Sequence, residues 1–446
     1  MTITKKEYAR RRSNLMGLME PNSIAVLPAA REKVRSRDTD YHFRQDSDFF
    51  YLTGFEESDA VLVLLPGREY GEYVLFCKEK DPAKEMWDGC LMGPAGACAK
   101  LGADDAFPIE DIDDILPGLL EGRERVYYSL GKDASFDQHL MEWVNSLRAM
   151  VESGAHPPGE FLDLDHLLHD MRLFKSAAEQ KVMAKAGEIT SKAHVRAMQA
   201  CKPGVMEYQL EAEILHEFAI NGARHAAYTT IVGGGKNACI LHYINNSETL
   251  RNGDLVLIDA GCEYKGYAAD LTRTFPVSGK FSVAQRALYE LVLDMQNAAL
   301  EVIKPGSHWD DPHEISVKVA TAGLVRLGLL EGDVDELIAS GAYKRFYMHR
   351  IGHWIGLDVH DVGDYKVGEQ WRVLEPGMVM TMEPGIYIAS DDESVAKKWR
   401  GMAIRIEDVV IVTKEACQLL TTAPKTVEDI EQVMQKVDVF EDIALI

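Results

Sequence analysis

Short apolar runs mark the first part of the chain, up to about Leu173. Ala60–Leu65 is one such run and stops at Pro66–Gly67, and Tyr73–Cys77 is another. Runs of this length that end at turn-forming residues are typical of buried strands. We therefore predict that residues 1–173 form an N-terminal mixed α/β domain.

Helix signals begin after this part. Ser176 and Glu179 have the spacing of a capping box, and helix-forming residues continue to Cys201. Lys202–Gly204 then ends the predicted helix, because proline cannot continue a helix and glycine favours its end. A second helix is predicted over roughly Met206–Asn221.

The same arrangement recurs 102 residues further on. Ser282 and Gln285 again have capping-box spacing, and the predicted helix continues to Ile303 and stops at Lys304–Gly306. Another helical stretch follows near Glu314–Leu329. We interpret this as an internal duplication, with two units around a pseudo-twofold axis and a cleft between them. The expected fold class is therefore α/β, of the α+β kind, with the second domain at 174–446.

Composition and charge restrict the function classes. The chain has 446 residues, 46% of them hydrophobic, and a formal net charge of −23. The negative charge argues against nucleic acids and anionic membranes as partners, because both require clustered Lys and Arg. No apolar stretch has the length of a membrane span, and the polar N-terminus shows no signal peptide. Seven scattered cysteines favour a reducing compartment, so we expect a cytoplasmic protein.

Two apolar-rich runs flank the turn-like segment Glu263–Gly266. In a regular hairpin centred between Tyr264 and Lys265, Asp259 faces Asp270. Directly opposed side chains have Cβ atoms roughly 4.5–5.5 Å apart, where two carboxylates repel each other unless a cation lies between them. Carboxylates alone suit hard ions such as Mn²⁺ or Mg²⁺. The alternative is a solvated acidic pair on an exposed face.

Histidines are concentrated in the segment Met348–Asp361, which contains His349, His353 and His360. Neutral imidazole is a common metal ligand and the usual proton carrier near neutral pH. Structural histidines that cap a loop are the alternative.

Two glutamates stand at the ends of strand-like runs. Glu383 precedes Pro-Gly, and alternation over Met402–Ile406 puts Arg405 and Glu407 on one face. Each glutamate alone is more often a surface carboxylate than a ligand. Glu375 precedes an identical Pro-Gly pair, so the tripeptide does not select between the two.

The glycine run Gly233–Lys236 lacks the spacing of a P-loop and a following Ser or Thr. A phosphate cradle is therefore not predicted. The sequence also contains no GxSxG nucleophile motif.

Taken together, these segments resemble the M24 metallopeptidase family, which has the pita-bread fold. The resemblance rests on an ordered set: Asp259, Asp270, His353 in a Gly-His-Trp-Ile-Gly loop, Glu383 before Pro-Gly, and Glu407 in Arg-Ile-Glu-Asp. Within the family it points to the aminopeptidase P group, because Asp38–Phe55 is similar to the first domain of that group and Met171–Ser176 to its domain junction. It covers essentially the whole chain. It implies a pita-bread catalytic domain at 174–446 and an N-terminal domain that serves oligomerisation and substrate access.

The resemblance implies two divalent metal ions, most often Mn²⁺. Asp259 would hold one metal alone, Asp270 and Glu407 would bridge both, and His353 and Glu383 would hold the other. The implied activity is that of a metal-dependent aminopeptidase that releases the N-terminal residue from peptides with proline in the second position, by attack of a metal-bridging hydroxide.

Roles for further residues also follow from the resemblance. Glu383 would transfer a proton, His360 and His242 would stabilise the oxyanion or bind the proline segment, and Arg405 would bind substrate or orient Glu407. Substrate-binding roles fall on His349, Tyr387, Tyr228, Asp38 and Trp87. In the family, the tryptophan that Trp87 matches reaches a neighbouring subunit's site, which implies a homotetramer or a dimer. Core packing is the alternative for Trp87.

Two rival functions remain at this point. A prolidase, which cleaves Xaa-Pro dipeptides only, has the same five ligands, and the N-terminal segment favours the aminopeptidase. A non-catalytic peptide-binding module on the same fold is the alternative from another class, and such proteins typically lose ligands.

Overall fold

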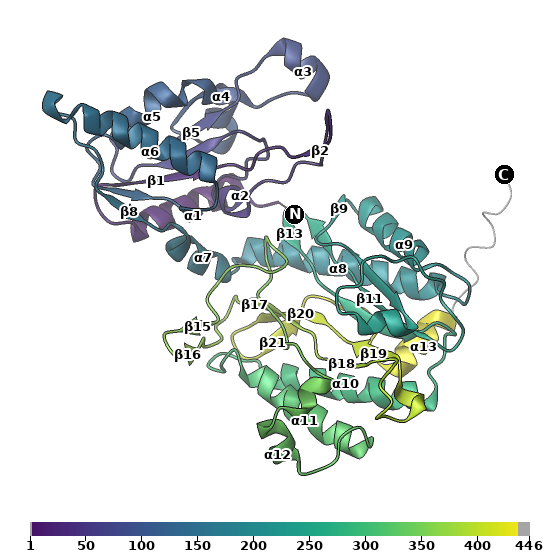
Figure 1. Ribbon diagram of the computed structural model, residues 1–446. Helices are drawn as coiled ribbons and strands as arrows, with labels where there is room; N and C mark the ends of the chain where they lie inside the picture. The colour runs from purple at the N-terminus through teal and green to yellow at the C-terminus, as the bar shows by residue number, and fades with distance from the viewer. Residues whose placement is uncertain (1, 436–446) are drawn as a thin grey trace. The chain divides into compact units, whose positions relative to one another are not determined.

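The computed structural model describes residues 2–435, which divide into two compact units (Figure 1). The N-terminal unit comprises Thr2–Arg172, and the C-terminal unit begins at Leu173. Among residues 2–435, none of the helices combines the length and the apolar character that a membrane-spanning segment needs.

A six-stranded sheet forms the centre of the N-terminal unit, in the order β6-β5-β4-β1-β7-β8. β1 pairs antiparallel with β4 and parallel with β7, so the sheet is mixed. The two predicted apolar runs form β4 and β5, whose residues are all buried and pack with α5 and α6 in one core. The predicted mixed α/β character of this part is confirmed. The elements are α1 (Lys5–Leu18), β1 (Ser23–Pro28), β2 (Val34–Ser36), β3 (Thr39–Asp40), α2 (Ser47–Thr53), β4 (Val61–Leu64), β5 (Tyr73–Cys77), α3 (Pro82–Asp88), α4 (Gly93–Gly96), β6 (Asp105–Pro108), α5 (Ile112–Leu120), β7 (Arg125–Tyr127), α6 (Ala134–Ala149), β8 (Glu160–Leu162) and α7 (Asp165–Leu173).

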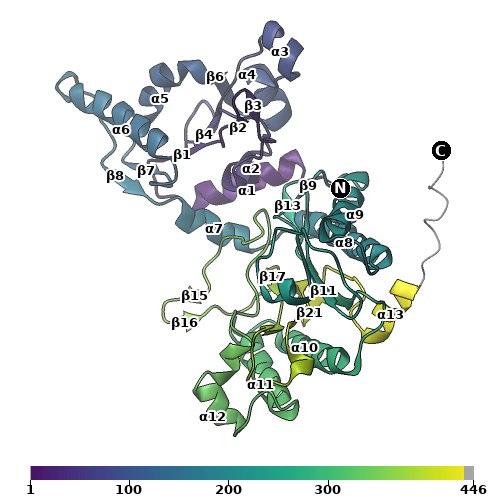
Figure 2. The ribbon, with the colours of Figure 1, turned by 45° about the vertical axis from the view of Figure 1, so that its right-hand side comes forward.

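Two helix pairs enclose the strands of the C-terminal unit (Figures 1 and 2). α8 packs against α9, and α10 packs against α11. A three-stranded antiparallel sheet follows each pair, β10-β11-β14 in the first half and β17-β20-β21 in the second. This repeated helix–sheet unit confirms the predicted α+β class. The elements are α8 (Ala177–Ala200), α9 (Glu207–Ile220), β9 (His225–Ala226), β10 (Ile231–Gly234), β11 (Leu255–Asp259), β12 (Cys262–Tyr264), β13 (Tyr267–Ala268), β14 (Thr272–Pro276), α10 (Val283–Val302), α11 (Asp311–Arg326), α12 (Val334–Ala339), β15 (Lys366–Val367), β16 (Gln370–Trp371), β17 (Val379–Met382), β18 (Gly385–Ile388), β19 (Met402–Arg405), β20 (Asp408–Val412), β21 (Cys417–Leu419) and α13 (Val427–Gln435).

Local capping chemistry explains where the long helices begin. At α8, the Ser176 hydroxyl accepts a hydrogen bond from the Glu179 N–H, and the Ser176 N–H donates to Glu179 Oε2 at 2.8 Å. Ser282 and Gln285 make the same reciprocal pair at α10, so both predicted capping boxes are confirmed. α11 begins three residues earlier than predicted, with a proline in its first turn, where the fixed φ of proline suits a helix.

The hairpin after β11 has a different register from the predicted one. Asp259 faces Thr272, not Asp270, so the predicted direct pairing is wrong. The turn consists of Lys265 and Gly266, both with positive φ, which places its centre one residue further along the chain than predicted. This change moves every facing partner by two positions. Because side chains alternate with a period of two, Asp270 keeps its predicted side of the hairpin.

Candidate metal centre

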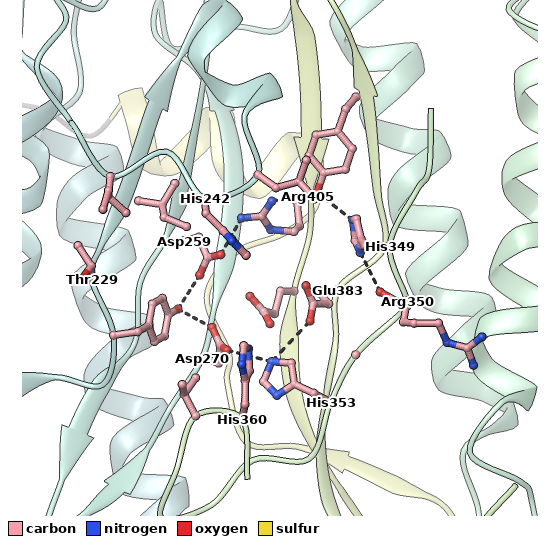
Figure 3. Close-up of a pocket in the computed structure, with 18 residues that line it drawn as sticks. Thr229, His242, Asp259, Asp270, His349, Arg350, His353, His360, Glu383 and Arg405 are labelled. Carbon is pink, nitrogen blue, oxygen red and sulfur yellow. Dashed lines mark hydrogen bonds and ion pairs between the residues drawn. The ribbon is translucent and has the colours of Figure 1, made fainter. Parts of the chain in front are cut away.

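A cavity of about 350 Å³ in the C-terminal unit brings the predicted site residues together (Figure 3). All five predicted metal ligands line it, although they come from strands and loops far apart in the sequence. The predicted catalytic and substrate-binding residues of this unit line it as well: Tyr228, His242, His349, His360, Tyr387 and Arg405.

The two aspartates are joined by a tyrosine hydroxyl. Asp259 ends β11 and Asp270 precedes β14. The Tyr228 Oη lies 2.6 Å from Asp259 Oδ1 and also hydrogen-bonds Asp270 Oδ1. The backbone segments that follow Asp259 and precede Asp270 lie close together. A Cβ on Gly261 would lie 1.7 Å from the Ala269 carbonyl oxygen. Tyr228, predicted to bind substrate, thus contacts the carboxylates themselves.

The orientation of His353 leaves one ring nitrogen available for a metal. Its Nδ1 lies 2.9 Å from the Trp354 carbonyl oxygen, a contact that assigns the proton to Nδ1. Its Nε2 faces Asp270 Oδ2 at 3.5 Å and Glu383 Oε1 at 3.6 Å. The backbone N–H of His353 donates to Thr381 Oγ1 at 3.0 Å, so both the ring and the backbone are fixed.

The two glutamates are held by backbone and hydroxyl contacts. Glu383 follows β17, and its N–H donates to the Ile351 carbonyl at 2.7 Å. Glu407 lies between β19 and β20, and its Oε2 accepts the Thr272 hydroxyl at 2.7 Å. Glu375, which has the same Pro-Gly sequence after it, is exposed and lies outside the cavity lining. The structure therefore distinguishes the two glutamates where the tripeptide could not.

Burial and mutual repulsion raise the pKa values of three carboxyl groups. Burial, followed by the charge of Asp259, holds the pKa of Asp270 well above its ordinary value. Burial and the charge of Asp270 do the same for the pKa of Glu407. Burial and the charge of Glu407 raise the pKa of Glu383 to about 8. The protein's own cations therefore do not balance the negative charge of these carboxylates, and divalent metal ions would supply the missing positive charge.

The donor set fits a hard metal ion. One ligand atom from each of Asp270, His353 and Glu407 lies within 4.8 Å of the others. Asp259 and Glu383 add two more carboxylates to the same cavity. Four carboxylates and one imidazole form an oxygen-rich set that suits ions such as Mn²⁺, and it contains no thiolate of the kind found in many structural zinc sites.

Arg405 is the cation paired with this cluster, and it lies at one end of a hydrogen-bonded chain. Its Nη2 lies 2.6 Å from Asp259 Oδ2, and its Nη1 donates to Tyr387 Oη at 2.9 Å. Tyr387 Oη lies 3.0 Å from His349 Nε2, and burial lowers the pKa of His349 to about 4, which keeps this ring neutral. Thr272 connects Arg405 to Glu407, because its hydroxyl accepts from Arg405 Nε at 3.3 Å and donates to Glu407 Oε2.

Two exposed imidazoles border the cavity. The His360 ring lies 4.3 Å from the His353 ring, and partial burial of the ring together with the charge of His353 lowers the pKa of His360. His242 enters from the loop after β10 (Figure 3). Two other predicted residues, Asp38 and Trp87, belong to the N-terminal unit and are exposed there. Trp87 is 85% exposed, which contradicts the alternative that it packs in the core.

Sequence reasoning missed Thr272 and Thr381. Thr272 contacts Glu407, and the Thr381 hydroxyl donates to Glu383 Oε1 at 3.3 Å. Thr272 follows Asp270, and Thr381 precedes Glu383, by two positions each. Because strand residues two apart share a face, that spacing was the available signal.

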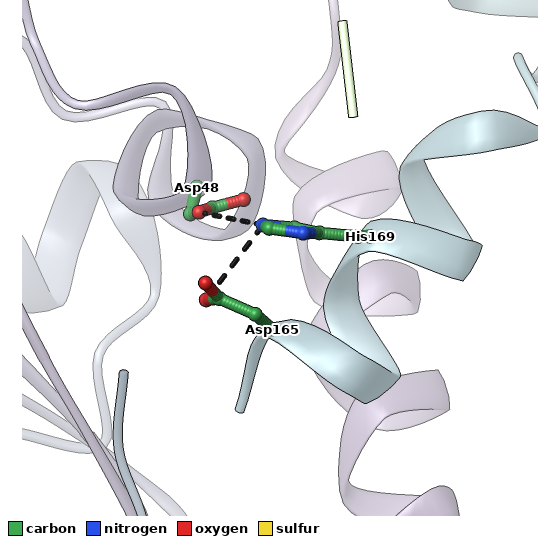
Figure 4. A group of neighbouring side chains, drawn as sticks. All are labelled: Asp48, Asp165 and His169. Atoms are coloured by element: carbon green, nitrogen blue, oxygen red, sulfur yellow. Dashed lines mark hydrogen bonds and ion pairs between the residues drawn. The ribbon is translucent and has the colours of Figure 1, made fainter. Parts of the chain in front are cut away.

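A second group of possible ligand side chains lies in the N-terminal unit, where Asp48, Asp165 and His169 meet (Figure 4). Lys132 Nζ lies 3.0 Å from Asp48 Oδ2 and 2.9 Å from Asp165 Oδ1, and Arg172 Nη1 lies 2.7 Å from Asp48 Oδ1. Burial raises the pKa of Asp48, but His169, Arg172 and Lys132 together hold it well below its ordinary value. The carboxylates are already neutralised, so this group is a salt-bridge cluster that joins α2 to α7.

Comparisons with known proteins cover both units. A model of metallopeptidase family M24 matches residues 181–414, and a model of the aminopeptidase P N-terminal domain matches residues 8–127. The chain is 47% identical over 434 residues to the Xaa-Pro aminopeptidase of Escherichia coli, which covers 97% of this chain and 98% of that protein. It is 35% identical over 444 residues to Xaa-Pro aminopeptidase 3 of Homo sapiens, with 97% and 86% covered.

Solved structures agree with these relatives. The structure of Pseudomonas aeruginosa aminopeptidase PepP matches with a TM-score of 0.96 and 61% identity, covering 97% of this chain and 99% of that chain. The structure of zinc-substituted E. coli aminopeptidase P in complex with product matches with a TM-score of 0.95 and 47% identity, covering 98% and 99%.

Proposed function

This chain belongs to metallopeptidase family M24, and we propose that it is a metal-dependent aminopeptidase that releases the N-terminal residue from peptides with proline in the second position. One observation carries the proposal. Five ligand side chains from separate segments meet in a single cavity that also holds three further imidazoles and a buried arginine. That convergence also argues against a non-catalytic binding module, which would have no need of a complete ligand set.

The ligand assignment is part of the proposal. Asp259 would hold one ion, Asp270 and Glu407 would bridge two, and His353 and Glu383 would hold the second. Two bound divalent ions would act as Lewis acids and lower the pKa of a shared water molecule. The Zn-substituted relative supports a metal-dependent site, and the oxygen-rich donor set supports Mn²⁺ as the native metal.

The chain's own groups have separate tasks around the scissile bond. Glu383 would take a proton from the attacking water and return it to the prolyl nitrogen of the leaving group. His360 and His242, on the open side of the cavity, would donate to the oxyanion or bind the prolyl segment. Arg405 keeps Asp259 and Tyr387 in place, and the neutral His349 would accept or donate a hydrogen bond without adding charge.

Proline makes a dedicated site necessary. The nitrogen of the scissile bond is the ring nitrogen of proline and is tertiary, so this bond offers no N–H group to a general peptidase. We propose that Asp38 and Trp87 contribute to substrate binding in a homotetramer or homodimer, since an exposed tryptophan is a common interface residue. We also propose a cytoplasmic location, supported by seven free cysteines in the described chain.

A peptide panel with metal add-back tests the activity. Purified protein should cleave Xaa-Pro-Yaa peptides, lose this activity after chelation, and regain it most fully with Mn²⁺. Cleavage of Xaa-Pro dipeptides alone would support the prolidase alternative instead.

The two identical Glu-Pro-Gly tripeptides provide a matched pair of variants. Glu383→Ala should abolish hydrolysis, whereas Glu375→Ala, at the exposed copy, should leave turnover unchanged. Unchanged turnover in Glu383→Ala would refute the site assignment.

A further inference from the structure

A buried carboxylate, that of Glu207, gathers four hydrogen bonds from one loop of the C-terminal unit. Glu207 is the first residue of α9 and is 0% exposed. Its Oε1 accepts from the Gly234 N–H at 2.8 Å and from Asn237 Nδ2 at 3.0 Å. Its Oε2 accepts from the Tyr243 hydroxyl and from the Glu248 N–H, both at 2.9 Å. One side chain therefore holds the start, the middle and the end of the same loop.

This loop, residues 234–248, carries His242 to the candidate metal centre, and we name it the pocket loop. The glycine run at its start has a packing reason. A Cβ on Gly234 would lie 2.5 Å from a methyl group of Leu250 and 3.4 Å from Glu207 Oε1. Gly234, in the run that does not form a phosphate cradle, thus allows the loop to approach Glu207 at the start of α9.

The position of the His242 imidazole depends on its backbone. Within residues 2–435, its ring makes no hydrogen bond that would orient it. The next residue, Tyr243, is 8% exposed, and its hydroxyl donates to Glu207 and accepts from Asn237 Nδ2 at 3.1 Å. A buried ring anchored at its far end restricts the backbone on both sides of it.

We propose that Glu207 is a positioning residue that, through Tyr243, fixes the imidazole of His242 over the centre. No Lys or Arg in the described part of the chain forms an ion pair with Glu207. The four donors and the N-terminal end of α9 stabilise its charge instead. This inference rests on the proposed Xaa-Pro activity, in which His242 contacts the substrate.

A double-mutant cycle tests the coupling. Tyr243→Phe keeps the ring and removes the anchor, so it should lower kcat/KM for an Xaa-Pro-Yaa peptide roughly tenfold. Metal content should not change, because Tyr243 is not one of the metal ligands. In a His242→Ala background, Tyr243→Phe should change kcat/KM by less than about twofold, because the group it positions is absent.

The matched control is Tyr128→Phe in the N-terminal unit. It removes a hydroxyl-to-carboxylate hydrogen bond of the same kind, 2.7 Å from Tyr128 Oη to Asp137 Oδ1, and should leave kcat/KM unchanged. Equal losses from Tyr243→Phe in the two backgrounds would overturn the proposal, as would a loss of bound metal in Tyr243→Phe.

Hydrogen exchange gives a readout that does not need activity. In metal-loaded full-length protein, Glu207→Gln should increase amide exchange in the pocket loop roughly tenfold, because the amide group of glutamine turns one acceptor into a donor that faces other donors. Tyr128→Phe should leave that exchange unchanged. Should Glu207→Gln fail to fold, Tyr243→Phe serves in the same measurement. Unchanged exchange in the loop refutes the anchor, whereas wild-type protein that cleaves no Xaa-Pro peptide refutes only the proposed activity.

Discussion

Removing one partner of the buried ion pair between Lys175 and Asp361 should destabilise the C-terminal unit. Each side chain is 1% exposed, and Lys175 Nζ lies 2.8 Å from Asp361 Oδ2. Lys175 lies just before α8, and Asp361 follows His360. One contact therefore joins the start of this unit to the segment Met348–Asp361, which carries three of the cavity's imidazoles.

The expected loss follows from the charge that stays behind. Lys175→Met removes the cation that faces the buried Asp361 carboxylate, which costs about 3–5 kcal/mol of the free energy of unfolding. The packing leaves little room for adjustment, since a Cβ on Gly356 would lie 2.1 Å from Asp361 Oδ2. At roughly 2–4 °C per kcal/mol for a unit of this size, Tm should fall by roughly 10 °C.

Scanning calorimetry of the single and double variants measures this loss. The double variant Lys175→Met with Asp361→Asn should recover part of it, because the buried negative charge is removed together with the cation. The control is Lys192→Met, which removes an exposed ion pair 2.6 Å long and should leave Tm unchanged. The buried pair would not stabilise the unit if Lys175→Met had the same Tm as Lys192→Met. The same would follow if the Tm loss of the double variant equalled the sum of the losses of the two single variants.

Three further outcomes are expected. Thr272→Val removes a 2.7 Å hydrogen bond to Glu407 and should weaken Mn²⁺ binding 10- to 100-fold, as measured by isothermal titration calorimetry; unchanged affinity would contradict the role of Thr272. Mn²⁺ at about 100 times its Kd should stabilise chelated protein by about 2.7 kcal/mol and raise Tm, whereas equal melting with and without Mn²⁺ would exclude a site in the folded state. Burial lowers the pKa of His194 from 6.5 to about 4, so the stability that goes with its neutral form is complete above pH 6.5 and is lost as the pH falls toward 4. Between pH 6.5 and 4.5, wild type should lose up to about 2.7 kcal/mol more than His194→Gln in urea unfolding, and parallel pH curves would show that His194 does not titrate as argued.

Features set by neighbouring residues could be predicted from the sequence. Both capping boxes depend on side chains three positions apart, and both form as expected. The hairpin could be predicted only in part. The side of Asp270 follows from alternation, but the register depends on a turn in which Lys265, a residue with a Cβ, adopts positive φ, a conformation that its sequence does not favour.

Contacts between distant segments could not be predicted in this way. Thr272 and Glu407 are 135 residues apart, and no local pattern connects them. Glu383 and Glu375 have identical neighbours on one side, so only the family resemblance favoured Glu383 before the fold was known. What separates them physically is β17, whose fully buried residues bring Glu383 to the Ile351 carbonyl beside His353.

The two groups of possible metal ligands among residues 2–435 show why one suits a metal and the other does not. At Asp48, the partners Lys132 and Arg172 are cations, so the carboxylate charge is already balanced and a divalent ion would have to displace them. In the cavity, most partners are neutral hydroxyl donors: Tyr228 for the two aspartates, Thr272 for Glu407 and Thr381 for Glu383. A hydroxyl orients a carboxylate but leaves its charge in place. The repulsion that raises these pKa values is therefore preserved by the fold, and binding of cations is what relieves it.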